Sequence, residues 1–261
     1  MKPLNEYLNK SKHLIETVEA QSEQIRRAAD WFSETILAGR MVHVFGSGHS
    51  RIMVEELWPR YGSFPGFNPI VELSLSFHNL VVGANGQRQA MFLENVSGLA
   101  DRILRNFDCS EEDTALVISS SGTSTVSVEM AERFQSMNIK VVALTTAASA
   151  ERSSSSRADG KKLHDFADLV LDTGAPAGDA MVEIPGLETP VAPGSTVGGA
   201  MVINCIKAEV AKRLTDAGAP PYVLTGGTVV GENRSRELFE RAYDEHAHRL
   251  ARLYANVGTH E

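Results

Sequence analysis

The sequence predicts an α/β fold in which a mainly parallel five-stranded sheet carries helices on both faces, forming a three-layer sandwich. Two observations support this prediction. Between residues 41 and 172, short apolar β-forming runs alternate with segments of helical periodicity, which is typical of repeated βαβ units. Two of these strands also end in turns rich in glycine and hydroxyl side chains, at the edge where such folds place their ligands.

The five predicted strands are residues 41–45, 70–73, 114–119, 141–145 and 168–172. Helical periodicity predicts helices over residues 4–38, 51–58, 86–106, 126–137, 161–167, 197–214 and 234–254, and turn residues predict a small hairpin over 181–191. We expect one domain over residues 1–261, with its core at about 30–215. The apolar stripe of the helix over 4–38 is too long for one sheet to cover, so we expect part of it to pack against another subunit.

Charge and composition exclude several classes of protein. The 261 residues carry a formal net charge of −8, which disfavours nucleic-acid binding because there is no excess of cations to neutralise a phosphate backbone. No run approaches the ~18 apolar residues that span a bilayer, and the first residues lack the apolar core of a secretory signal. With only Cys109 and Cys205, we expect a cytoplasmic protein with reduced thiols.

The most informative stretch is the strand end at residues 116–124, where an apolar run meets a cluster of hydroxyl side chains. The cluster consists of Ser119, Ser120, Ser121, Gly122, Thr123 and Ser124. A helical pattern begins directly after it, so free backbone N–H groups, the positive end of the helix dipole and several hydroxyls can converge on one anion. The alternative interpretation is a polar loop that caps the helix.

A second turn, Gly46–Ser50, comes directly after the first predicted strand. It is not a dinucleotide fingerprint, because Arg51 stands where a third glycine is expected. It is not a P-loop either, because it lacks a subsequent Gly-Lys-Ser/Thr sequence. Both turns are therefore expected at the carboxyl edge of the sheet as the walls of one site.

Together these motifs resemble the sugar isomerase (SIS) domain family. The resemblance rests on Ser119-x-Ser121-Gly122-x-Ser124, on Gly46-Ser47-Gly48-His49-Ser50, and on Leu163 with Phe166-Ala167-Asp168-x-Val170-Leu171. It covers about residues 30 to 215. The segments Gly178-Asp179-Ala180 and Gly194-Ser195-Thr196-Val197-x-Gly199-Ala200 are similar to those of SIS proteins labelled phosphosugar or phosphoheptose isomerase.

The resemblance implies a flavodoxin-like sheet, a phosphorylated sugar as ligand, and a homodimer or homotetramer whose subunits share active sites. The positions that match the family's phosphate-binding turn are Ser119, Ser121 and Ser124, with Ser120, Gly122 and Thr123 between them. In the first turn, Ser47, Gly48 and Ser50 match positions that approach the sugar or its phosphate. Asp179, Ser195 and Thr196 are expected to cap a helix or to line the pocket.

For the chemistry we expect aldose–ketose isomerisation through an enediol, which needs a base and a ring-opening acid. Glu56 matches a catalytic glutamate of phosphoheptose isomerases, although the spacing is about one helical turn shorter. Glu72 is a second candidate base. Those enzymes also use a late-helix histidine, which residues 201–204 lack, so His49 and His78 are the available replacements. His43 is expected to be structural. No residue spacing indicates a metal site, and no cofactor is expected. The resemblance leaves zinc open, since phosphoheptose isomerases can bind it.

Two other functions remain open on the same fold. A lyase or etherase acting on a phosphorylated amino sugar is one alternative, since Gly194-Ser195-Thr196 before a helix is faintly similar to that group. A non-catalytic sensor of sugar phosphates is the other. Such sensors usually carry a DNA-binding or partner domain, and the 40 or so residues before the first strand are too few and too acidic for one.

Overall fold

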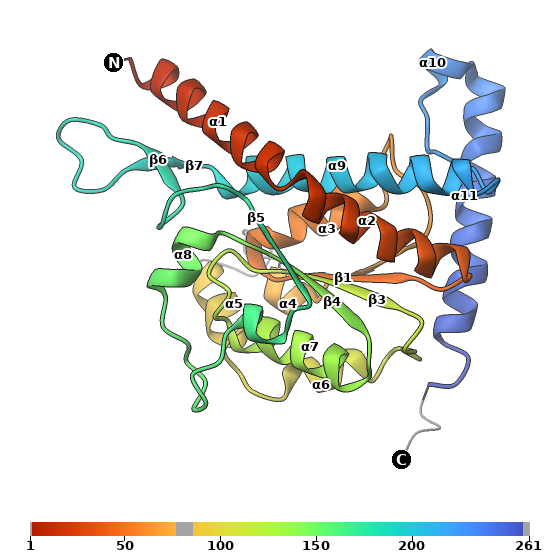
Figure 1. Cartoon of the computed structure of the whole chain (residues 1–261), viewed down its shortest axis with the longest axis horizontal. Coiled ribbons are helices and arrows are strands. Elements are labelled where there is room, and N and C mark those ends of the chain that lie inside the picture. The colour runs from red at the N-terminus through yellow and green to blue at the C-terminus, as the bar shows by residue number, and fades with distance from the viewer. Residues whose placement is uncertain (1, 77–85, 258–261) are drawn as a thin grey trace.

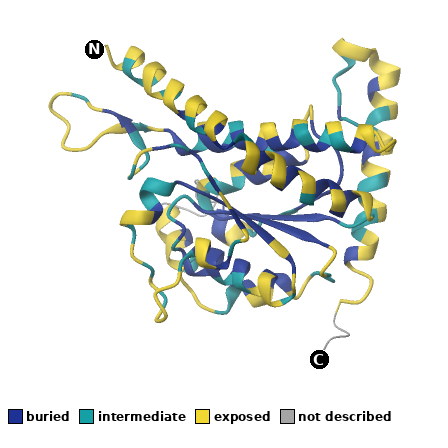
Figure 2. Ribbon diagram, in the orientation of Figure 1, coloured by how far each residue is buried: buried dark blue, intermediate teal, exposed yellow. Residues whose placement is uncertain are grey.

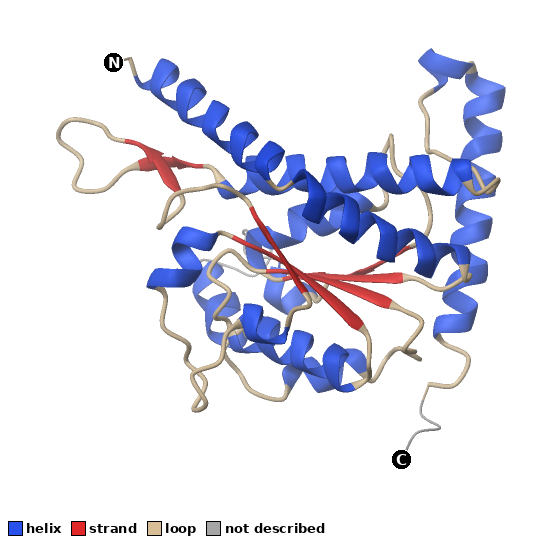
Figure 3. Cartoon of the chain, viewed as in Figure 1, coloured by secondary structure: helices blue, strands red, loops and turns tan. Residues whose placement is uncertain are grey.

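A five-stranded parallel sheet forms the centre of the chain. The computed structural model describes residues 2–76 and 86–257. The strands are β1 Val42–Gly46, β2 Phe67–Ile70, β3 Thr114–Ile118, β4 Lys140–Thr145 and β5 Leu169–Asp172. They lie in the order β2-β1-β3-β4-β5, and every pairing is parallel. The predicted α/β fold with a flavodoxin-like sheet is therefore confirmed (Figure 3).

Helices cover both faces of this sheet (Figure 1). One face packs against α2 Ser22–Leu37, α3 Arg51–Leu57 and α9 Ser195–Asp216, and the other against α6 Leu99–Leu104, α7 Thr125–Ser136 and the 3₁₀ turn Leu163–Phe166. The strands supply both layers by alternation, so Leu116 and Ile118 face one layer while Ala115 and Val117 face the other. Figure 2 shows the resulting buried interior.

The helix predicted over residues 4–38 is two helices, α1 Pro3–Ala20 and α2. The side chain of Gln21, at the junction, bonds the main chain of edge strand β5. Its Nε2 donates to the Asp172 carbonyl at 2.6 Å, and its Oε1 accepts from the Asp172 N–H at 2.9 Å. The amide thus satisfies backbone groups that the sheet edge would leave open. The predicted apolar stripe consists of Leu14, Val18, Ile25, Ala29, Phe32 and Ile36, and all six side chains are buried within the one chain. The expectation that part of this stripe needs another subunit to cover it is therefore wrong.

Other element boundaries differ more from the prediction. The helix predicted over 86–106 is divided into α5 Gln87–Leu93 and α6, with Gly98 in the left-handed region at φ 83° just before α6. The strand predicted at 70–73 lies three residues earlier, as β2. The short helices α4 Leu73–Ser76, α8 Ala147–Arg152 and α10 Gly227–Val230 were not predicted. Each has at most six residues, too few for a clear hydrophobic period.

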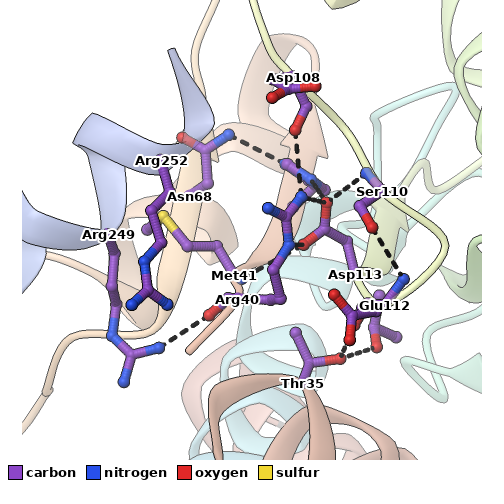
Figure 4. Close-up of polar contacts among 12 residues, drawn as sticks. Thr35, Arg40, Met41, Asn68, Asp108, Ser110, Glu112, Asp113, Arg249 and Arg252 are labelled. Carbon is purple, nitrogen blue, oxygen red and sulfur yellow. Dashed lines mark hydrogen bonds and ion pairs between the residues drawn. The ribbon is translucent and has the colours of Figure 1, made fainter. Parts of the chain in front are cut away.

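At the amino edge of the sheet, a polar cluster joins the strands to the last helix, α11 Glu232–Leu253 (Figure 4). Arg40 forms two hydrogen bonds to the carboxylate of Asp113, at 2.9 and 2.8 Å. From α11, Arg249 donates to the carbonyls of Ile36 and Arg40. These contacts fix α11 across the edge opposite to the glycine- and serine-rich turns.

The predicted structural role of His43 is confirmed in this cluster. The imidazole is fully buried, with Nε2 3.1 Å from Asp113 Oδ2. Burial is the largest single contribution and lowers the pKa of His43, but the hydrogen bonds and charges of Asp113 and Cys109 together outweigh it and raise the pKa to about 9.

The predicted hairpin is confirmed as β6 Ala180–Val182 paired antiparallel with β7 Val191–Pro193. It projects beside α1 (Figure 1). Within residues 2–76 and 86–257, no helix has the length and apolar character needed to cross a membrane. The same part of the chain contains both cysteines, and both thiols are free.

Candidate functional site

The two glycine- and serine-rich turns lie side by side at the carboxyl edge of the sheet. β1 and β3 are neighbours, with Gly46 in register with Ile118. From β1 the chain passes to α3 on one face, and from β3 it passes to α7 on the other. This divergence is the topological switch point of a doubly wound sheet, where such folds form a crevice for ligands.

A cavity of about 430 Å³ opens between these turns. Eleven residues singled out in the sequence line it: Ser47, Gly48, His49, Ser50, Ser119, Ser120, Ser121, Ser124, Asp179, Ser195 and Thr196. The other lining residues are Met53, Leu75, Gln87, Ala90, Met91, Glu94 and Pro193. No lysine or arginine occurs among these lining residues, all of which belong to the described segments.

Gly122 and Thr123 do not line the cavity but shape the turn behind it. Gly122 adopts φ 65°, a left-handed conformation that favours glycine, and its N–H donates to the Ser119 carbonyl at 3.1 Å. Thr123 donates to Ser121 Oγ through both its N–H and its hydroxyl. The turn is thereby held so that the serines at its corners face the cavity.

Helix α7 begins directly after this turn. Its N-cap, Ser124, makes no side-chain hydrogen bond to the helix backbone; its hydroxyl donates to Ser127 Oγ at 2.9 Å. The positive end of the α7 dipole therefore adds to the hydroxyls of the turn. A phosphate placed here would be held by neutral donors and the helix terminus, as the sequence predicts.

Sequence reasoning missed Glu94, a carboxylate that the structure brings into this cavity. Glu94 comes directly after α5, and its Oε2 accepts a 2.8 Å hydrogen bond from Ser47 Oγ. Its carbonyl accepts the N–H of Val126, so the end of α5 is tied to the start of α7. Burial raises the pKa of Glu94, and the bond from Ser47 only partly opposes this shift. A half-buried acid with a raised pKa is typical of proton-transfer sites.

Asp179 supplies a second carboxylate. It adopts φ 72°, and its Oδ1 accepts the N–H groups of Gly194 and Ser195 at 3.0 and 2.6 Å. Its Oδ2 accepts the Ser195 hydroxyl at 2.8 Å. Asp179 therefore caps the start of α9 from the hairpin, while Ser195 and Thr196 line the cavity beside it.

Glu56 lies outside this cavity. Its Oε1 accepts from Asn204 Nδ2 at 2.8 Å, its Oε2 pairs with Arg60, and its carbonyl accepts from Lys207 Nζ. Burial alone would raise the pKa of Glu56, but the hydrogen bonds from Asn204 and Arg60 lower it. The residue faces a separate hollow beside α11, lined by Tyr61, Phe239 and Tyr243 among others.

The other predicted acid–base residues are divided among different places. His49 lines the cavity. Glu72 does not line the cavity. Its Oε1 accepts hydrogen bonds from the N–H and the hydroxyl of Ser74 in α4. His78 falls outside the described residues. Over residues 2–76 and 86–257, no three His, Cys, Asp or Glu side chains cluster as a metal would require.

A doubly wound parallel sheet with a hydroxyl-lined cavity at its switch point defines the class: an α/β protein with a small-molecule site at the strand ends. Residues 6–146, more than half of the chain, match the family model described as SIS domain. The chain therefore belongs to the SIS-domain family. A UPF0309 protein of Halalkalibacterium halodurans is 32% identical over 218 residues, 84% of this chain and 88% of that protein. A UPF0309 protein of Brucella canis is 32% identical over 225 residues, 86% and 89% of the two chains.

Solved structures share the fold. A phosphoheptose isomerase from Francisella tularensis aligns with a TM-score of 0.52 at 17% identity, over 80% of this chain and 96% of that one. The sugar isomerase domain of an RpiR transcription factor from Sphaerobacter thermophilus aligns with a TM-score of 0.50 at 15% identity, over 93% and 98%. At these identities the likeness establishes the fold alone.

Proposed function

We propose that this protein binds a phosphorylated sugar and catalyses aldose–ketose isomerisation through an enediol. One observation carries the proposal: Glu94, a half-buried carboxylate with a raised pKa, lines the same cavity as the hydroxyl turn at Ser119–Ser124. The cavity thus combines an anchor for an anion with a group suited to moving a proton. The phosphoheptose isomerase of matching fold supports the substrate class.

The phosphate is assigned to the turn after β3. Hydroxyls of Ser119 and Ser121 donate to its oxygens, Ser124 does so once its hydroxyl turns from Ser127 Oγ, and the start of α7 faces it. This contact contributes binding energy remote from the reacting carbons and orients them. Ser50, from the turn after β1, completes the cradle, while the hydroxyl of Ser47 in the same turn holds Glu94.

Proton transfer is assigned to Glu94. Its ionised carboxylate removes the proton from C2 of the open-chain aldose and returns it to C1, while O2 loses a proton and O1 gains one. The bond from Ser47 holds Oε2, which leaves Oε1 for the proton. His49 lies on the same cavity and is placed to open the ring and polarise the carbonyl. Glu56, held by Asn204 and Arg60 outside the cavity, is given a structural role.

Proton exchange tests this proposal directly. The protein is incubated in D₂O with a panel of aldose and ketose phosphates, and the C2 proton is monitored by NMR. Loss of the C2 signal, together with appearance of the second isomer, supports isomerisation. Binding without exchange for every sugar phosphate removes the isomerase and favours the sensor. Release of lactate or ammonia instead of an isomer identifies the amino-sugar chemistry.

We also propose a homo-oligomer, a dimer or tetramer. Helix α1 buries Leu14 and Val18, while Leu4, Leu8 and Ile15 on its other side are exposed by 67, 55 and 54%. Apolar side chains at these spacings form an unpartnered stripe that a second copy could cover. Light scattering after size exclusion should give at least twice 28.3 kDa, and Leu8→Asp should shift the protein to the monomer. A wild-type monomer at micromolar concentration would contradict this proposal.

A further inference from the structure

We propose that a second hollow, a groove along α6 and α7, binds a nucleotide and regulates the cavity that contains Glu94. The groove has a volume of about 950 Å³, more than twice that of the carboxyl-edge cavity, and the two have no described lining residue in common. Small-molecule sites typically measure about 300–1,000 Å³. Figure 1 shows α6 and α7 on the side of the sheet opposite α9. A ligand in the groove would therefore leave the carboxyl-edge cavity open for a sugar phosphate.

The groove carries an excess of positive charge in a chain whose formal net charge is −8. Arg102, Arg105 and Arg133 line it, and Asp101 is the one acidic residue among its described lining residues. Arg133 is paired with Asp101. The guanidinium groups of Arg102 and Arg105 form no hydrogen bond or ion pair with a described residue. Two cations with donors to spare therefore face the groove, which favours an anionic ligand.

The spacing of the two unpaired arginines favours a phosphate group. Arg102 lies in the last turn of α6, and Arg105 follows it three residues later at the C-cap, so both side chains leave one face of the helix. Like charges at this spacing repel each other when no anion lies between them. A guanidinium group presents paired N–H donors that match two phosphate oxygens. A phosphate held by both arginines would remove this repulsion.

Apolar side chains line much of the groove, so a phosphate alone does not complement it. Leu99, Leu104 and Met137 belong to this lining. Phe107 adds an aromatic ring that stacks on Tyr254, with the ring centroids 6.0 Å apart and the planes at 29°. Nucleobases are flat and pack well on aromatic side chains. A ligand that joins a flat ring to phosphate groups complements both parts of the groove, and a nucleotide has this chemistry.

A short segment after α5 connects the groove to the cavity of the proposed function. Glu94 lines the cavity, whereas Ser97 and Gly98 line the groove. Both ends of this segment are bonded to α7. The carbonyl of Glu94 accepts the N–H of Val126 at 2.9 Å, and Glu129 Oε2 accepts the N–H of Gly98 at 2.9 Å. A nucleotide that contacts Ser97 and Gly98 therefore acts on the segment that positions Glu94. This regulatory role rests on the proposed function, but nucleotide binding does not.

Calorimetry with the full-length protein tests nucleotide binding. The probes are the mono-, di- and triphosphates of adenosine and guanosine, compared with the free nucleosides, inorganic tripolyphosphate and laurate. We expect at least one nucleotide to bind about tenfold or more tightly than its own nucleoside and than tripolyphosphate, because both the base and the phosphates make contacts. The proposal is overturned if no nucleotide binds, if tripolyphosphate binds as tightly, or if laurate, an anion without a flat ring, binds more tightly.

The double variant Arg102→Gln/Arg105→Gln locates the bound nucleotide. Both positions are exposed and glutamine is a good helix former, so the fold should be retained, as thermal melting will check. The Kd for the nucleotide should rise about 100-fold, as loss of two charge-assisted contacts implies, and the Kd for a sugar phosphate alone should not change. Ser121→Ala should give the reverse pattern. Arg236→Gln, which removes an exposed charge on α11, should change neither Kd.

A measurement without any variant gives the same information. Wild-type protein saturated with a sugar phosphate should still bind the nucleotide, because the two ligands occupy different sites. Complete competition between them would place the nucleotide in the carboxyl-edge cavity and overturn the proposal, as would an unchanged nucleotide Kd in the double variant. If no nucleotide binds and the double variant changes the mass measured by light scattering, the groove is an interface between copies of the chain, which also overturns the proposal.

Regulation is tested by titrating each ligand in the presence of the other. Saturating nucleotide should change the Kd for the sugar phosphate by about fivefold or more, and linkage requires the sugar phosphate to change the nucleotide Kd by the same factor. Both ligands bound with no change in either Kd would overturn the regulatory role. If no sugar phosphate binds but a nucleotide does, the proposed function fails while the nucleotide site is supported.

Discussion

The substitution Glu94→Gln tests the assignment of proton transfer most sharply. Glutamine keeps the shape of the side chain, and its Oε1 can still accept the hydrogen from Ser47 Oγ, which donates to Glu94 at 2.8 Å in the structure. The change removes the basic oxygen alone. Since general acid–base groups contribute about 10²- to 10⁴-fold, the rate of C2 proton exchange should fall by this factor. This corresponds to about 3 to 5 kcal/mol of transition-state stabilisation, at about 1.36 kcal/mol per tenfold.

The stability of this variant provides an internal check. Burial raises the pKa of Glu94, so the ionised carboxylate is held at a cost in free energy that a neutral amide does not carry. The melting temperature of Glu94→Gln should therefore equal or exceed that of the wild type, and the Kd for a sugar phosphate should not rise. Glu56→Gln is the comparison, and it should retain most of the exchange rate. Normal exchange by Glu94→Gln, with loss of exchange in Glu56→Gln, would refute the reasoning and restore the assignment made from the sequence.

Three other contacts each make a prediction. Ser121→Ala and Ser124→Ala should each weaken binding of a sugar phosphate about 10- to 100-fold, as loss of one charge-assisted hydrogen bond implies. Neither change should alter binding of the unphosphorylated sugar. Equal losses of affinity for both ligands in calorimetry would contradict the phosphate assignment. The pKa of His43 is raised to about 9, so its contribution to stability is complete below about pH 6.5 and is lost as the pH rises through 9. The free energy of unfolding measured in urea should therefore fall by about 3 kcal/mol over this window. A flat profile would show that the imidazole is neutral. Gly198→Ala should destabilise the fold by at least about 2 kcal/mol, because a Cβ there would lie 1.9 Å from the carbonyl oxygen of Thr173. An unchanged midpoint of urea unfolding would show that α9 can move away from the end of β5.

The fold was predictable from the sequence because its signals are local. Buried parallel strands are continuous apolar runs, and the amphipathic segments between them have a helical period. The two turns were also predictable from local signals, since each is a contiguous stretch directly after a strand. Once the fold is a parallel sheet, residues 46–50 and 119–124 must share one edge.

The acid–base residue was not predictable in the same way. Glu94 lay inside a predicted continuous helix over 86–106. In such a helix the sequence does not distinguish a carboxylate that faces a binding site from one that faces solvent. The sequence signal for a break in this helix was the glycine at position 98. In the structure Gly98 has a left-handed φ of 83° and lies between α5 and α6. Glu56 was chosen by resemblance, but its hydrogen-bond partner Asn204 lies 148 residues away. A sequence does not show which distant side chain will donate a hydrogen bond to a given carboxylate.

Asp179 shows a third kind of limit. Its sequence context, between Gly178 and Ala180, predicted a cap or a pocket residue. The structure shows both, because the hairpin folds back so that Asp179 meets Ser195 at the start of α9. Caps are usually read from adjacent residues, and this one is contributed from 16 residues upstream.

A crystal structure of the protein with a bound sugar phosphate tests the central claim most directly. We expect the phosphate at the turn Ser119–Ser124, facing the start of α7, with C1 and C2 of the sugar within hydrogen-bonding reach of Glu94 and with no contact to Glu56. A phosphate bound elsewhere, or a sugar whose C1 and C2 lie against Glu56 instead of Glu94, would contradict this claim.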